Sequence, residues 1–243
     1  MRIWENPDMG LIWLRIRAPF AAYRPMQAGS LRATLPVMTY SALWGLALNL
    51  AGIETRQDHG RVATGIDPAA PALRLAIGLP GVPAGVSSLF QQVHSYPVGN
   101  ASAHLEAGTH GAKYHIAPAR RELLVDLDVV TGIDGEQAVL DRVLMGLAGS
   151  GNWSRYGLPF AGDNNLLFDR IDPLPSPPPC RWYTTVDPRG RPQPGATRLS
   201  TNIDRADSSR TQSAQVAPTP NALHEPPGDA WHLIGPAVAE RAR

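Results

Sequence analysis

The sequence lacks several kinds of residue and segment, and each absence excludes a class of protein. Its only cysteine, Cys180, excludes a disulfide framework and a zinc site built from several thiolates. No apolar run approaches the roughly 20 residues of a membrane helix, and Met1 to Glu5 does not open a signal peptide. Only 18% of the 243 residues are charged and 43% are hydrophobic, so most of the chain can fold around a core. We therefore expect a soluble cytoplasmic protein with no membrane partner.

Lysine is nearly absent as well, because Lys113 is the only one in the sequence. Any bound anion must then meet mainly arginine, whose planar guanidinium group forms a fork that fits phosphate. The net charge of +1 predicts no partner, but the charges are unevenly distributed. Residues 10–53 contain four arginines and no acid, and residues 122–141 contain six acids and no base. This distribution predicts one basic face and one acidic flank.

Proline divides the sequence into two parts. Residues 1–172 contain 11 of the 24 prolines, and residues 173–243 contain the other 13. Because proline at this density breaks helices and strand ladders, we expect a folded body over residues 1–172 and an irregular, proline-rich extension over residues 173–243. Trp182 and Trp231 are costly to leave in water, so they predict an extension anchored on the body. The alternative is a disordered extension.

Hydrophobic periodicity in the body alternates between strand and helix patterns. The predicted elements are strands over residues 10–17, 72–79 and 122–130, and helices from Thr39 or Ser41 to about Leu50 and from Gln137 to Leu147. The first strand stops before Pro19, and its alternation places Arg15 and Arg17 on the face opposite Leu14. This order predicts an α+β fold, a ferredoxin-like sheet with helices on one face. Residues 80–118 are too long for an ordinary connection, so we expect an inserted hairpin or a functional loop there.

Few patterns in the sequence point to catalytic chemistry. The long middle segment contains four histidines, which are His94, His104, His110 and His115. They are spaced more widely than zinc ligands usually are, so we expect no metal. Residues 113–115 read Lys-Tyr-His, side chains that can cleave RNA without a metal, but a hairpin strand of mixed polarity is the simpler interpretation. No nucleotide-binding loop or nucleophile elbow occurs, so we expect no cofactor, and Gly157 to Asn165 has the composition of a structural turn.

The arginines of the first strand and of the chain that follows are the most suggestive group. Arg15, Arg17 and Arg24 lie in the segment without acids, with Tyr23 and Tyr40 nearby. Guanidinium groups for phosphates and aromatic rings for bases are the ingredients of single-stranded nucleic-acid binding. The alternative is that Arg17 or Arg24 pairs with an acid elsewhere in the fold. The residues alone therefore indicate an α+β domain with the ingredients of an RNA-binding protein.

Several phrases are distinctive enough to compare with known families. They begin with Leu14-Arg-Ile-Arg-Ala-Pro-Phe-Ala-Ala-Tyr-Arg24 and Ser41-Ala-Leu-Trp-Gly-Leu-Ala-Leu-Asn-Leu-Ala-Gly-Ile-Glu54, and continue with Arg74 to Leu79, Ala119 to Leu127 and Gly157 to Arg170. Together, and in this order, they resemble the CRISPR-associated Cas-five family. The last phrase, Gly-Leu-Pro-Phe-Ala-Gly-Asp-Asn-Asn-Leu-Leu-Phe-Asp-Arg, resembles the DevS-type (Myxococcus-type) branch. The resemblance covers roughly residues 10–172.

The resemblance implies an RNA-binding subunit of a type I Cascade surveillance complex, a RAMP protein of antiviral defence. Family members have a ferredoxin-like (RRM-like) palm and a protruding hairpin thumb, which would occupy about residues 87–118. A satellite layer packed on the palm is the alternative for that segment. The implied partners are the 5′ handle of the CRISPR RNA, the Cas-seven filament that this subunit caps and the adjacent large subunit. Target DNA near the protospacer-adjacent motif is a further candidate, although its sequence would be recognised by the guide RNA.

The resemblance also directs the choice of site residues. The candidate RNA-binding residues are Arg15, Arg17, Tyr23, Arg24, Arg32, Tyr40, Ser41, His94, Arg120 and Arg121. We expect no catalytic activity. The alternative is a metal-independent endoribonuclease that processes the CRISPR RNA precursor, as in one branch of the family, with Tyr40, Lys113 and His115 in the catalytic roles. A third class is a regulatory or structural protein with no RNA ligand.

Overall fold

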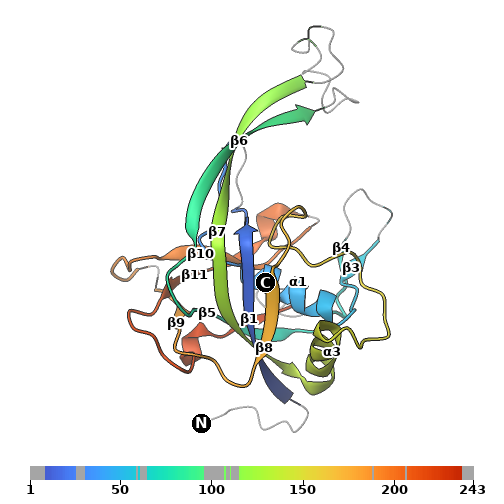
Figure 1. The fold of residues 1–243 in the computed structure, drawn as a ribbon, viewed down its shortest axis with the longest axis vertical. Coiled ribbons are helices and arrows are strands. Elements are labelled where there is room, and N and C mark those ends of the chain that lie inside the picture. Colours follow the sequence, from blue (N-terminus) through green and yellow to red (C-terminus); the bar gives the residue numbers. More distant parts are fainter. Residues whose placement is uncertain are drawn as a thin grey trace.

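In the computed structural model, a large sheet forms the centre of the molecule and two helices lie against one of its faces (Figure 1). The structure describes residues 9–25, 31–58, 60, 65–95, 107, 110, 115–187, 189–205 and 207–236. Within these residues ten strands belong to the large sheet and two to a small one. None of the described helices is long and apolar enough to cross a membrane. The predicted α+β class is confirmed.

The elements follow the predicted order in the body, and further strands follow in the tail. Those up to residue 174 are β1 (Met9–Ala21), β2 (Leu31–Arg32), α1 (Tyr40–Leu50), β3 (Arg56–Gln57), β4 (Gly65–Ile66), β5 (Leu73–Leu79), β6 (Gly85–Ser95), β7 (His115–Glu136), α3 (Gln137–Leu147) and β8 (Arg170–Leu174). Those of the tail are β9 (Arg181–Thr185), β10 (Thr197–Asn202), the 3₁₀ turn η2 (Ser208–Arg210), β11 (Gln212–Pro218), the 3₁₀ turn η3 (Gly228–Ala230) and β12 (His232–Ile234). Both predicted helices are confirmed.

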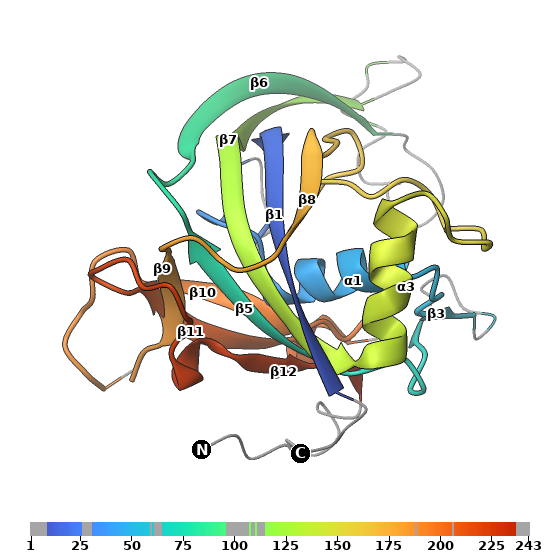
Figure 2. The ribbon, with the colours of Figure 1, turned by 60° about the horizontal axis from the view of Figure 1, so that its bottom comes forward.

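Four strands of the body form the middle of the sheet in the order β5-β7-β1-β8, each antiparallel to its neighbours. The chain leaves β1 through α1 and returns as β5, and it leaves β7 through α3 and returns as β8. β1 and β5 therefore run parallel on either side of β7, while β7 and β8 run parallel on either side of β1. Figure 2 shows both helices on the same side of this sheet. Two interleaved β-α-β units thus build the body.

The larger core lies between the helices and the face of β1 that carries Leu14 and Ile16, both fully buried. Helix α1 begins at a predicted cap, because the Thr39 hydroxyl accepts a hydrogen bond from the Ala42 N–H at 3.2 Å. The helix ends before Gly52, whose φ of +64° is a left-handed conformation that glycine adopts without strain. The capping residues and the buried face therefore define the same boundaries for this helix.

Strand β1 is longer than the sequence predicted, because it continues through Pro19 to Ala21. Proline has no N–H to donate to a ladder. The ladder between β1 and β7 skips Pro19 and Asp126, which lie opposite each other, and Asp126 has a φ of +58°. The predicted stop before Pro19 is wrong because a strand accepts proline where the ladder is interrupted.

Strands β6 and β7 form a long hairpin that rises away from the body (Figure 1). β7 has 22 residues, far more than the predicted strand over 122–130, since it pairs with β5 and β1 in the body and with β6 beyond it. Residues 85–92 of β6 are all exposed. Residues 96–106 and 111–114, which include Lys113, lie outside the described residues.

The chain after residue 174 is not the irregular extension that its proline content predicted. β9 and β12 pair with opposite ends of the same edge of β5. β11 then pairs with β9, and β10 with β11, which extends the sheet. The described prolines of the tail lie outside strands, apart from Pro173 and Pro218 near the ends of β8 and β11. Proline content wrongly predicted an irregular tail because most of these prolines lie in the connections between strands, where they do not interrupt a ladder.

A second buried cluster forms where the tail covers the face of the sheet opposite the helices. The rings of Trp182 and Trp231 each lie 5.9 Å from the ring of Trp13 on β1, measured between centroids. Trp182 is fully buried and its indole N–H donates to the Leu223 carbonyl at 2.8 Å. A Cβ added to Gly132 of β7 would lie 2.6 Å from both Trp13 and Trp231. The prediction that two tryptophans anchor the tail on the body is confirmed.

Replacing Trp182 by alanine should lower the free energy of unfolding by about 3–5 kcal/mol, because it removes a fully buried aromatic side chain and leaves a cavity. Equilibrium denaturation with urea measures the change. Leu233→Ala on β12 is a matched control, since Leu233 is 49% exposed and its truncation should cost about 0.5 kcal/mol or less. Equal losses in the two variants would contradict an anchoring role for Trp182.

Candidate nucleic-acid interface

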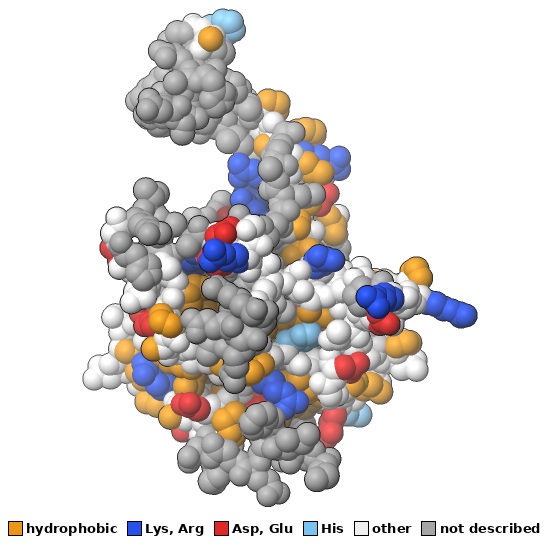
Figure 3. All heavy atoms as spheres, turned by 180° about the vertical axis from the view of Figure 1, so that it is seen from behind, with side chains coloured by type: hydrophobic (Ala, Val, Ile, Leu, Met, Phe, Trp, Pro, Cys, Tyr) orange, Lys and Arg blue, Asp and Glu red, His pale blue; other side chains and the backbone are white. Residues whose placement is uncertain are grey.

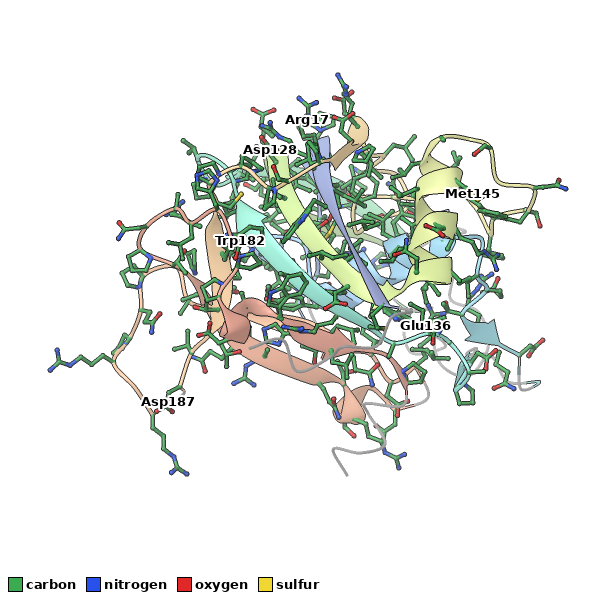
Figure 4. All side chains as sticks on the ribbon, turned by 90° about the horizontal axis from the view of Figure 1, so that it is seen from below. Arg17, Asp128, Glu136, Met145, Trp182 and Asp187 are labelled. Atoms are coloured by element: carbon green, nitrogen blue, oxygen red, sulfur yellow. The ribbon has the colours of Figure 1, made fainter. Side chains whose placement is uncertain are left out.

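The two predicted arginines of β1 lie on the sheet face opposite the helices, and both are paired with acids. Arg15 binds Asp128 of β7 through two hydrogen bonds of 2.9 Å and 2.6 Å, which raise the pKa of Arg15. Arg17 binds Asp172 of β8 at 3.0 Å, and Figure 4 shows Arg17 and Asp128 on neighbouring strands. Hydrogen bonds hold the pKa of Asp172 below its usual value, with the larger contribution from Arg170 and the smaller from Arg17. Pairing with an acid elsewhere in the fold, the alternative that the sequence raised for Arg17, describes Arg17, and Arg15 is paired in the same way.

Arg24 and Arg121 meet at one carboxylate at the base of the hairpin. Both guanidinium groups bind Oδ2 of Asp163. The side chains of Asp163 and Arg121 are almost fully buried, whereas that of Arg24 is 45% exposed. Nη1 of Arg121 also donates to Gln91 of β6 at 3.5 Å, and its Nε has no partner among the described residues. Two guanidinium groups on one carboxylate leave a net positive charge at this point.

The loop between α3 and β8 carries Asp163 into this position. The Ala22 N–H donates to the Ala161 carbonyl at 3.0 Å, which fastens the loop to the end of β1. Gly162 has a φ of +84° and lies so close to the Ala22 carbonyl that any Cβ would collide with it. The Leu166 N–H donates to the Asp163 carbonyl at 2.9 Å and closes the turn. The phrase predicted to be a structural turn is one, and its turn presents a carboxylate to two arginines.

Two further arginines have no acidic partner among the described residues, and one of them, Arg120, projects from the face of β7 opposite its neighbour Arg121. Arg120 of β7 binds only the Ser88 hydroxyl of β6, through Nε at 3.2 Å and Nη2 at 3.1 Å. Arg32 of β2 lies opposite Arg121 in the parallel ladder between β2 and β7. The adjacent acid of β7, Glu122, accepts a hydrogen bond from a backbone N–H. Figure 3 shows basic side chains gathered where the hairpin joins the body. We call Arg24, Arg32, Arg120 and Arg121 the arginine group.

The remaining predicted site residues do not join the arginine group. Tyr23 and Tyr40 are 3% and 0% exposed, and burial raises the pKa of both. Their rings lie in the core, so the expectation that they stack on bases is wrong. The Ser41 hydroxyl lies 3.1 Å from that of Thr39 at the start of α1. The backbone of His94 lies in β6, and its side chain is outside the described part of the chain.

The sequence analysis did not identify the acidic residues that form ion pairs with the predicted arginines, which are Asp128, Asp163 and Asp172. It also placed the basic and acidic segments on separate faces, whereas β1 and β7 are neighbours, so Asp128 lies beside Arg15 and Arg17. Asp163 had one local signal, its place between a glycine and two asparagines in a turn. Nothing near Asp128 in the sequence marks it as a partner of Arg15, and the neighbouring Arg170 does not reveal that Asp172 also binds Arg17, because both pairings depend on strand order.

The site shows no sign of metal or thiol chemistry. Across the residues that the structure describes, no three His, Cys, Asp or Glu side chains gather into a group that could hold a metal ion. Cys180 is buried, and burial raises the pKa of its thiol to about 11. A protonated, buried thiol is a poor nucleophile and a poor ligand. The arrangement can bind anions through arginine.

One protein family matches the sequence over most of the body. Residues 11–156, more than half of the chain, match the model of the family described as "CRISPR-associated protein (Cas_Cas5)". No curated protein matches the sequence. A solved chain of a "CRISPR RNA-guided surveillance complex" has a similar fold, with a TM-score of 0.50 and 16% identity over 91% of this chain and 96% of that chain. A second solved chain, "Crystal structure of Cas protein", has a TM-score of 0.43 and 15% identity over 90% and 100% of the two chains.

Replacing Asp163 by asparagine should destabilise the fold by about 3–5 kcal/mol, because the buried Arg121 would lose the one carboxylate that binds it among the described residues. The free energy of unfolding, measured with urea, reports the loss. Asp207→Asn is the control, since Asp207 pairs with the exposed Arg210 and such surface pairs contribute at most about 1 kcal/mol. A loss at Asp163 no larger than that at Asp207 would show that the carboxylate does not hold the two arginines.

Proposed function

The chain belongs to the CRISPR-associated Cas5 family, and we propose that it is the subunit that grips the 5′ handle of the guide RNA in a type I Cascade complex. Family membership, together with the fold shared with a surveillance-complex chain, supports a Cascade component. The specific role rests on the site. The guide RNA would be held through its phosphates, so the subunit needs positive charge that the fold itself does not neutralise.

The observation that carries the proposal is the uncompensated charge of the arginine group. Arg32 and Arg120 have no acidic partner in the described part of the chain, and Arg24 shares Asp163 with Arg121. By contrast, Arg15 and Arg17 are each bound to a carboxylate. Guanidinium groups engaged in the fold cannot give both planar N–H pairs to a phosphate. The base of the hairpin is therefore where we place the RNA backbone.

The same proposal names the parts of the molecule. Strands β5, β7, β1 and β8 with helices α1 and α3 are the ferredoxin-like palm, and the β6–β7 hairpin is the thumb. The segment from Gly157 to Arg170 contains the turn that positions Asp163, and its resemblance to the DevS-type branch supports assigning the chain to that branch. The proposed protein partners are the Cas-seven-type filament subunit that this chain would cap and the large subunit beside it, with target DNA near the protospacer-adjacent motif as a further partner.

In a variant with Arg32→Ala and Arg120→Ala, binding of handle RNA should weaken and its salt dependence should fall. Each phosphate contact on a single strand contributes about −0.7 to the slope of log K against log salt, so losing two should flatten it by about 1.4. Fluorescence anisotropy of labelled handle RNA between low and high salt measures the slope. The double variant Arg15→Ala with Arg17→Ala is the comparison and should leave the slope unchanged. If this second variant alone flattens it, RNA lies on the sheet face and the proposed site is wrong.

We also propose that the subunit binds RNA without cleaving it. Tyr40, a catalytic candidate in the endoribonuclease alternative, is buried with its pKa raised, and a neutral phenol in the core cannot take a proton from a ribose hydroxyl. Repeat RNA incubated with the purified subunit and a metal chelator should therefore remain intact on a denaturing gel. Discrete cleavage at one position, abolished by Tyr40→Phe, would favour the nuclease alternative.

A further inference from the structure

Phe90 is the exposed aromatic ring of the described part of the hairpin. It lies on β6 with 81% of its surface exposed. A single exposed ring is not by itself a site, but an exposed ring beside an exposed cation offers both the contacts that a nucleotide needs. Because Tyr23 and Tyr40 are buried, Phe90 supplies the ring that a base-binding surface at the hairpin otherwise lacks.

Phe90 stands next to Arg120, which projects from the face of the hairpin opposite Arg121. Phe90 and Arg120 are direct partners in the ladder between β6 and β7, so their side chains project from the same face of the hairpin. The Arg120 guanidinium is held by Ser88, two residues before Phe90 and therefore on that face as well. A ring and a cation are thus fixed side by side.

The charges around this pair favour RNA over an apolar protein surface as the occupant. Residues 75–105 contain no Asp, Glu, Lys or Arg, so β6 offers no carboxylate to Arg120. An apolar protein surface placed over Phe90 would also cover Arg120 and leave a desolvated, unpaired charge, which is strongly unfavourable. A nucleotide covers the ring with its base and pairs the cation with its phosphate.

We propose that Phe90 is a base-stacking residue: one base of the single-stranded handle lies on the ring while Arg120 binds an adjacent phosphate. This inference rests on the proposed function, since it takes the guide RNA as the ligand. Every base has a π-face, so stacking on phenylalanine tolerates any of the four. Phe90 therefore contributes affinity and fixes the path of the strand, and it does not select a sequence.

The test compares variants at Phe90 by their affinity for single-stranded handle RNA at one salt concentration, measured by anisotropy. Phe90→Leu should bind about 5- to 150-fold more weakly, which is the loss of one base–aromatic stack, and Phe90→Tyr should restore binding. The slope with salt should stay unchanged because no phosphate contact is lost. Val86→Ala is the matched control, as Val86 is 59% exposed on the same face of β6. All these side chains are exposed, so thermal unfolding should not change.

The other outcomes overturn the inference in distinguishable ways. If Phe90→Leu binds like the wild type while Arg32→Ala with Arg120→Ala binds weakly, the stacking role is wrong and the RNA site stands. If the wild-type subunit does not bind handle RNA at all, both proposals are wrong. If Phe90→Leu binds RNA normally but no longer assembles with the other subunits of the complex, Phe90 serves a protein contact.

Discussion

Three tryptophan rings packed over two glycines join the tail of the chain to its first strand. Trp13 comes from β1 and the other two rings from the tail, each 5.9 Å from it. The sheet positions beneath the rings must be glycine. A Cβ on Gly132 would lie 2.6 Å from two of the rings, and a Cβ on Gly78 would lie 2.7 Å from Trp182. Since β9 and β12 also pair with β5, the tail closes both a face and an edge of the sheet.

That closure determines which arginines remain available. On the face opposite the helices, Arg15 and Arg17 lie beside β7 and β8, where Asp128 binds Arg15 and Asp172 binds both Arg17 and the exposed Arg170. Asp163 is shared by Arg24 and Arg121 and therefore neutralises only one of them. Positive charge in excess of the local acids thus collects at the base of the hairpin, next to Arg32 and Arg120. The interface follows from where the fold has placed its carboxylates.

Local signals predicted the parts of this structure that are locally determined. The helix from Gln137 to Leu147 and the helix capped by Thr39 follow from periodicity and capping. The tail strands do not, because short polar segments become strands only when a neighbouring strand accepts their hydrogen bonds. Burial of Tyr23 and Tyr40 was equally invisible in the sequence. The pair of Arg15 and Asp128 joins residues 113 positions apart, and only the strand order reveals that they meet.

The greater length of β7 compared with β1 explains why the unpaired Arg120 and the exposed Phe90 ring lie together. β1 ends at Ala21, paired with Leu124, whereas β7 extends outward to His115. Within the shared length, Arg15 and Arg17 of β1 lie beside Asp128, one of the acids of residues 122–141. Beyond it, Arg120 and Arg121 precede that acidic run and face β6, which has no charged residue at all. Arg121 still meets an acid, Asp163 of the loop between α3 and β8. The outgrowth of β7 therefore carries Arg120 past the acids that would neutralise it, and places it opposite an uncharged strand whose exposed ring is Phe90.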